Sequence, residues 1–161
     1  MYRISIFFLF VYICFSSLKG KAQDFDKATF YKVLAADNEK ELDEQLNLVK
    51  KSGIKEKAAY EGVLLMKKAG LLKKPKDKLN TFKAGHKKLE PAIAADQDNM
   101  EYRFLRVLIQ ENAPKILGYK KELAADSQLI NSNFNLLSPL LKQVITDYSK
   151  KSKTIKIPNR N

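Results

Sequence analysis

Two arginines and two neighbouring polar residues form the most distinctive group of side chains in this sequence. Arg103, Arg106 and Gln110 are spaced at i, i+3 and i+7, so in a helix they share one face, and Glu111 lies at its edge. A guanidinium group binds a carboxylate through two parallel hydrogen bonds, so this face suits a carboxylate of a protein or peptide partner. Alternatively, the two arginines pair with Asp or Glu on neighbouring helices and are structural.

The other candidates for catalysis or metal binding are weaker. His86 is the single histidine, and its place on an apolar helical stripe indicates a packed side chain. One histidine and one cysteine (Cys14) are too few ligands for an ordinary transition-metal site. Residues 96–99 lack the glycine and the distal glutamate of a calcium loop, so they predict a helix cap and a turn. We therefore assign no catalytic residue and expect no metal and no cofactor.

Carboxylates are the remaining route to catalysis. A glycoside hydrolase needs two of them at a defined separation, and spacing alone sets no such pair among Glu61, Glu90, Glu101 and Glu111. The sequence also lacks the glycine motifs of phosphate-binding loops and serine hydrolases. Two alternatives to partner binding stay open. One is a small enzyme acting on envelope polymers, with Glu101 or Glu111 as acid or base. The other is a lysine-driven binder of anionic lipid or polysaccharide.

The first 22 residues are typical of a cleavable signal peptide. An apolar run from Ile4 to Phe15 follows a cationic start and is too short for a membrane span. Gly20 and Ala22 suit a cut before Gln23; the alternatives are an uncleaved anchor or a lipid attached to Cys14. Cleavage would remove the only cysteine, so the protein would be exported without disulfides. We expect a periplasmic or secreted bacterial protein with no transmembrane segment after cleavage.

Charge is the clearest bulk property of the sequence. The formal net charge is +12, and 27 basic and 18 acidic residues remain beyond residue 22, which leaves +9. Only three of those basic residues are arginines, whereas nucleic-acid readers rely on arginine. The small share of arginine among the basic residues argues against a nucleic-acid partner. The lysine excess fits solvated lysine faces or a peripheral contact with an anionic envelope surface.

Hydrophobic periodicity predicts an all-α domain over residues 23–151, followed by a basic flexible tail at 152–161. Asn38 and Ser138 are expected helix caps, and Pro91 is expected to kink or break the fourth helix. Short links between the helices imply antiparallel neighbours. The expected helices span 25–36, 38–53, 54–70, 76–95, 100–113, 119–134 and 139–151.

The junction between the fourth and fifth helices resembles a tetratricopeptide (TPR) repeat junction. The family pattern is Ala-hydrophobic-x-x-Asp-Pro-x-Asn, and the matching residues are Ala92, Ile93, Asp96 and Asn99, with Gln97 in place of the proline. Tyr60 and Tyr102, which begin comparable helices, are 42 residues apart rather than the family's 34. The resemblance implies a TPR-like helical array, the alternative being an irregular antiparallel bundle of about seven helices.

The leader ends in Ala22-Gln23, and a run from Glu101 to Pro114 covers the expected fifth helix. In both features the whole chain also resembles small exported helical proteins of Bacteroidota, whose leaders often end in Ala-Gln. In TPR arrays the first helix of each pair lines a concave groove, which would place Arg103, Arg106 and Gln110 on a binding face. The expected function is therefore an exported, non-enzymatic helical module that binds a protein or peptide in the bacterial envelope.

Overall fold

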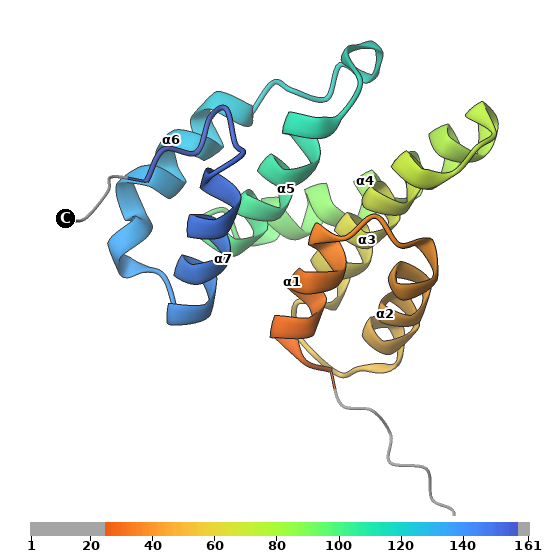
Figure 1. Cartoon of the computed structure of the whole chain (residues 1–161), viewed down its shortest axis with the longest axis horizontal. Helices are drawn as coiled ribbons and strands as arrows, with labels where there is room; N and C mark the ends of the chain where they lie inside the picture. The colour runs from red at the N-terminus through yellow and green to blue at the C-terminus, as the bar shows by residue number, and fades with distance from the viewer. Residues whose placement is uncertain (1–24, 158–161) are drawn as a thin grey trace, which may run out of the picture.

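Seven α-helices and two short 3₁₀ helices, with no strand, make up residues 25–157, which are the residues described by this computed structural model (Figure 1). The expected all-α bundle of about seven helices is confirmed. The expected leader (1–22) and the end of the expected tail (158–161) lie outside the described residues. The elements are α1 (Lys27–Ala35), α2 (Glu39–Lys51), α3 (Lys57–Leu71), α4 (Pro75–Ala95), α5 (Met100–Asn112), η1 (Lys115–Leu117), α6 (Leu123–Asn133), η2 (Phe134–Leu136) and α7 (Pro139–Ser149).

Side-chain caps set several of these boundaries. Asn38 accepts hydrogen bonds from the first backbone N–H groups of α2, and its amide donates to Glu41 Oε1 at 2.7 Å. Asn99 caps α5 through Tyr102 N, and Ser138 caps α7 with Pro139 as the first helical residue. The caps expected at Asn38 and Ser138 are therefore confirmed, because each side chain satisfies N–H groups that the helix itself leaves unpaired.

The closest helix crossing lies between α3 and α4, which form an antiparallel pair at the centre of Figure 1. Gly62 and Gly85 face each other there. A Cβ atom at Gly62 would lie 2.9 Å from the Gly85 carbonyl, and one at Gly85 would lie 2.5 Å from the Gly62 carbonyl. The two backbones therefore approach to a distance that only glycine permits, and this fixes the position of α4.

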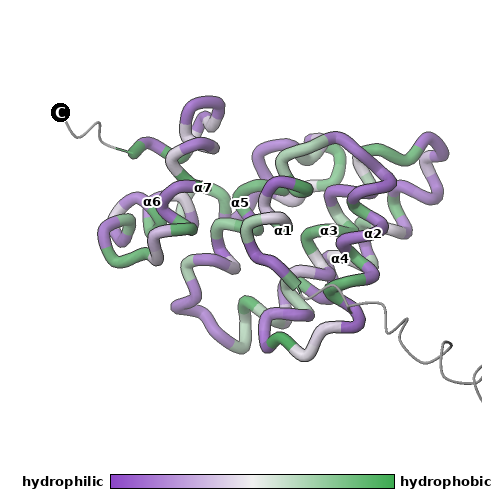
Figure 2. Tube along the Cα trace, turned by 60° about the horizontal axis from the view of Figure 1, so that its bottom comes forward, coloured by the Kyte–Doolittle hydropathy of each residue, from purple (hydrophilic) through white to green (hydrophobic). Residues whose placement is uncertain are grey.

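Amphipathic helices pack around this pair. In Figure 2 the tube changes between hydrophobic and hydrophilic colours within single helices, as expected where each helix buries one side. Along α3, Tyr60, Val63 and Leu64 are fully buried. Helices α2, α4 and α5 all contact α3, and α6 contacts α5. The buried apolar side chains of these helices join into one core.

Two features of helix α4 bear on the expectations. Of the kink or break expected at Pro91, the break does not occur, since the helix continues to Ala95; Lys87 and Pro91 are both exposed, so water can reach the carbonyl that the proline leaves without a donor. The apolar stripe of α4 is also only partly covered. Leu89 is fully buried, whereas Leu79, three turns earlier, is 42% exposed.

The C-terminal segment 152–157 is packed, in contrast to the flexible tail expected from residue 152. Ser152 is buried and Ile155 is fully buried. Asn131 of α6 accepts a hydrogen bond from the backbone N–H of Lys156 and donates one to the carbonyl of Thr154. The basic composition of this segment indicated a solvent-exposed tail. One of its apolar side chains is nevertheless buried, and side chains of the helices form hydrogen bonds with several of its backbone groups.

Candidate functional site

The two arginines that dominate the sequence analysis lie in a buried ionic network. Arg106 donates from Nε to Asp126 Oδ2 at 2.7 Å and from Nη1 to Glu90 Oε2 at 2.9 Å, and Arg103 Nη1 donates to Asp126 Oδ1 at 2.7 Å. Asp126 is fully buried and Arg106 is only 6% exposed. The network joins α4, α5 and α6, which is the structural alternative predicted for the arginines.

Electrostatics holds the Arg106 guanidinium in its charged form. Burial lowers the pKa of Arg106, but the hydrogen bonds that it donates to Asp126 and the charges of Asp126 and Glu90 raise the pKa by more, so the net shift is upward. A buried charge of this kind is tolerated because its partners are close and oriented. Removing either partner would leave the buried guanidinium with a single carboxylate to compensate its charge.

The other two predicted binding residues also face inward. Gln110 is fully buried and donates to Glu122 Oε2 at 3.4 Å. Glu111 accepts hydrogen bonds from the hydroxyl groups of Tyr148, Ser152 and Thr154, and from the backbone N–H of Thr154 at 2.9 Å. The expectation of an open groove formed by these residues is thus corrected: α6, α7 and the C-terminal segment cover that face of α5.

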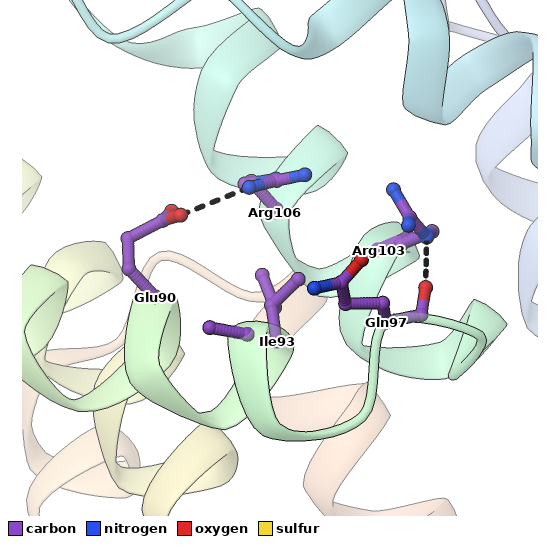
Figure 3. Close-up of a pocket in the computed structure, with 6 residues that line it drawn as sticks. Glu90, Ile93, Gln97, Arg103 and Arg106 are labelled. Atoms are coloured by element: carbon purple, nitrogen blue, oxygen red, sulfur yellow. Dashed lines mark hydrogen bonds and ion pairs between the residues drawn. The ribbon is translucent and has the colours of Figure 1, made fainter.

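A small polar pocket of about 220 Å³ lies beside the arginines (Figure 3). It lies between the end of α4 and α5, and Arg106 points across it to Glu90, while Arg103 donates to the carbonyl of Gln97 at 2.7 Å. The charged groups in this pocket are already bonded to one another. The guanidinium groups therefore leave few unpaired hydrogen-bond donors for an incoming anion.

The four glutamates considered for catalysis also connect helices. Glu61 pairs with Lys88 at 2.8 Å. Glu101 accepts from the hydroxyl groups of Tyr31 at 2.7 Å and Tyr60 at 2.5 Å, which joins α1, α3 and α5. Burial and the Glu101 charge both raise the pKa of Tyr60, so its hydroxyl stays protonated and donates. Glu90 and Glu111 belong to the contacts described above. Each carboxylate thus has a structural role.

A second, more apolar cleft of about 290 Å³ lies where the apolar stripe of α4 is uncovered. We call it the aromatic cleft and define it by Leu79, Phe82, Lys83, His86, Leu117, Gly118 and Tyr119. One wall is the first half of α4, and the other is the segment at and after η1. Gly118 adopts a φ of 62°, in the left-handed region, and this turn directs the chain back toward α4.

Tyr119 forms the floor of the aromatic cleft. Its ring meets Phe82 edge-on at 5.5 Å between centroids and His86 at 5.1 Å, and its hydroxyl donates to Glu90 Oε1. Burial and Glu90 raise the pKa of Tyr119, which keeps that donor protonated. Glu90 therefore links the cleft floor to Arg106, so the arginine network supports the cleft from below.

The structure also places the remaining candidates from the sequence. His86 is half-buried against Tyr119, as expected of a packed side chain. Asn99 donates to Asp96 Oδ2 at 2.9 Å and caps α5, so the oxygen-rich turn acts as the expected cap. Within residues 25–157, His, Cys, Asp and Glu side chains form no group of three or more that could hold a metal ion.

Sequence reasoning missed the aromatic cleft because it treated the stripe on α4 as core along its whole length. The signal available was composition: residues 73–80 are mostly charged or polar, so few neighbours could cover that end of the helix. The turn of Tyr119 toward α4 had no sequence signal, since residues 119–134 were expected to be helical. Helix α6 begins only at Leu123.

Comparison with known protein families, curated proteins and solved structures finds no match. None of the helices within residues 25–157 has the length and apolar character that a membrane span requires.

Proposed function

We propose that this protein is an exported, non-enzymatic, TPR-like helical module that binds a protein or peptide partner in the bacterial envelope through the aromatic cleft. One observation carries the proposal. The apolar stripe of α4 loses its cover at Leu79, and a loop holding Leu117 and Tyr119 forms a facing wall instead of closing the gap. The leader at residues 1–22 supports export.

The size and lining of the cleft favour a side chain of a polypeptide. At about 290 Å³ it lies just below the range for small-molecule pockets, which is about 300–1,000 Å³. Its walls are aliphatic and aromatic, and the Tyr119 hydroxyl is committed to Glu90. The cleft therefore offers apolar surface to one or two side chains of a peptide. The backbone of that peptide would lie along the exposed surface of α4 beside the cleft. An envelope-polymer hydrolase is less well supported, because the candidate carboxylates serve in interhelical contacts.

Site-directed crosslinking tests the proposal. A photoreactive amino acid replaces Leu79 in one variant and Leu129, an apolar residue on α6 that is 37% exposed, in a matched control. Each is expressed in the native host, and the captured segment is identified by mass spectrometry and then synthesised. We expect capture only from position 79. We also expect the synthetic segment to bind wild type at least about tenfold more tightly than Leu79→Asp, with Leu129→Asp unaffected.

Equal capture from both positions would refute the cleft as the binding site. So would a captured segment that binds Leu79→Asp as tightly as wild type. Circular dichroism of both Asp variants checks folding, and both positions are partly exposed, so the helical signal should persist.

A further inference from the structure

Within residues 25–157, the lysines around the aromatic cleft have no carboxylate partners. On α4, Lys76, Lys83 and Lys87 are spaced at i, i+7 and i+11, which aligns them along one side of the helix next to the apolar stripe. All three are exposed, and Lys83 lines the cleft. Among the ion pairs within residues 25–157, none involves these three side chains.

The opposite wall of the cleft repeats this charge. Lys115, Lys120 and Lys121 flank the turn that carries Leu117 and Tyr119, and they too have no carboxylate partner in the described part of the chain. Both elements that form the cleft therefore carry lysines, and Lys83 lies in its lining. Figure 1 shows this turn and the first half of α4 projecting on the same side of the molecule.

Some lysines elsewhere in the fold are paired. Lys68 pairs with Asp43 at 2.5 Å, Lys67 with Asp37 at 2.6 Å, and Lys88 with Glu61 at 2.8 Å. Other lysines, such as Lys50, Lys51 and Lys55, also have no carboxylate partner among the described residues, so what distinguishes the cleft is that both elements forming its walls carry such lysines.

Acidic residues near the cleft do not balance these lysines. Asp77 is the only acidic residue in the first half of α4, and it lies two residues before Leu79, on the opposite side of the helix. Glu122 is the acidic residue nearest in sequence on the other wall, and it accepts a hydrogen bond from Gln110. Glu90 is engaged by Arg106 and Tyr119. The rim therefore carries a positive charge that an incoming anion can meet.

We propose that the aromatic cleft binds an acidic segment of a partner protein. One apolar side chain of that segment enters between Leu79, Phe82 and Tyr119, and Asp or Glu residues on either side of it meet the lysines of the two walls. This inference rests on the proposed function and adds the chemistry of the partner. Apolar burial supplies affinity, and charge complementarity supplies selectivity and a faster association.

The shape of the surface favours a polypeptide over a membrane. Lipid docking uses apolar side chains that protrude from a basic face. Here Phe82 and His86 are half-buried in a concave wall, and Tyr119 is only 8% exposed. Of the exposed large apolar residues within residues 25–157, Leu79 (42%) and Ile116 (94%) lie on the elements that form the cleft. Most of the apolar surface would thus be out of reach of a flat bilayer.

Peptide display tests the inference with a defined probe. A library of random peptides is panned against the protein without residues 1–22 at low salt. The same selection is run on two variants with equal charge change. The first is Lys76→Glu, Lys83→Glu and Lys87→Glu at the cleft. The control is Lys50→Glu, Lys51→Glu and Lys55→Glu, which changes three exposed lysines of α2 and the following loop that also have no carboxylate partner among the described residues.

We expect wild type and the control variant to enrich peptides in which Asp or Glu flanks a Leu, Phe or Tyr. The cleft variant should lose this enrichment. For a selected peptide, replacing its acidic residues by Asn or Gln should weaken binding about tenfold. Raising the salt to about 0.5 M should have a similar effect, because the Debye length falls to a few ångströms.

Each other outcome overturns a definite claim. Enrichment of apolar peptides without acidic residues, lost in Leu79→Asp, would refute the acidic partner and leave the proposed function standing. No enrichment at all, together with no crosslink from position 79, would refute the proposed function as well. Binding to vesicles containing phosphatidylglycerol that a selected peptide cannot displace, and that the cleft variant loses, would assign the lysines to lipid instead.

Discussion

Asp126 gives the sharpest test of the arginine network because two guanidinium groups depend on it. It is fully buried and accepts three hydrogen bonds: from Arg106 Nε at 2.7 Å, from Arg106 Nη2 at 3.0 Å and from Arg103 Nη1 at 2.7 Å. Asp126→Ala removes all three. It leaves Arg106, which is 6% exposed, with Glu90 as its remaining acidic partner.

The expected loss follows from that geometry. Removing one partner of a buried ion pair costs about 3–5 kcal/mol, because the surviving charge stays buried without compensation. A domain of this size has a free energy of unfolding of about 5–15 kcal/mol, so the loss is a large part of the total. The corresponding fall in Tm is about 10–20 °C. Urea unfolding and thermal melts followed by circular dichroism measure both quantities.

A matched control tests whether the loss of stability comes from the burial of Asp126 rather than from the ion pair alone. Asp147 also pairs with a cation, Lys150 at 2.7 Å, but both side chains are more than half exposed. Asp147→Ala should therefore cost at most about 1 kcal/mol. If Asp126→Ala costs no more than Asp147→Ala, the buried network is not a stabilising element and the reasoning is wrong. A double-mutant cycle with Arg106→Ala provides a second check, since strictly additive losses would also contradict the coupling.

Three further predictions concern other parts of the fold. Burial raises the pKa of Glu111, but hydrogen bonds from Tyr148, Thr154 and Ser152 lower it by more, so its contribution to stability is present above about pH 4.5 and lost as pH falls through the lower folded value. Glu111→Gln should therefore be less stable than wild type at pH 7, and the gap in urea midpoint should narrow by about pH 3. Gly62→Ala should cost about 1–3 kcal/mol in chemical unfolding because its Cβ meets backbone atoms at 2.8 and 2.9 Å. Gly70→Ala, with no atom within 4 Å, should be neutral or slightly stabilising, and a similar loss in both would contradict the close crossing. Ile155→Ala should cost about 2–5 kcal/mol if segment 152–157 is core, and a loss under about 0.5 kcal/mol would mean that it is a loose tail.

Local signals carried most of the fold prediction. Asn38, Asn99 and Ser138 lie at helix starts because their short side chains reach backbone N–H groups only a few residues away, so the sequence itself contains both partners. Helical periodicity likewise places Arg103 and Arg106 on one face of α5. These are interactions within one or two turns, which is the range over which a single sequence is informative.

Contacts between residues far apart in the sequence could not be predicted from such local signals. Asp126 lies 20 residues from Arg106, on a helix whose apolar pattern is weak, so nothing in the sequence indicated that it would be buried. Glu111 and Thr154 are 43 residues apart. The expected binding face and the expected loose tail both failed for this reason: each was a correct description of local chemistry without the partner that covers it.

The arginine network and the aromatic cleft are parts of one arrangement, connected through Glu90. One Glu90 oxygen accepts from Arg106 and the other from Tyr119, so the orientation of the cleft floor depends on a guanidinium that is itself held by Asp126. A floor fixed in this way loses little side-chain entropy when a ligand arrives, which favours binding. If the cleft binds a partner as proposed, the two arginines contribute from behind the surface, because they hold the ring against which the partner's apolar side chain would pack.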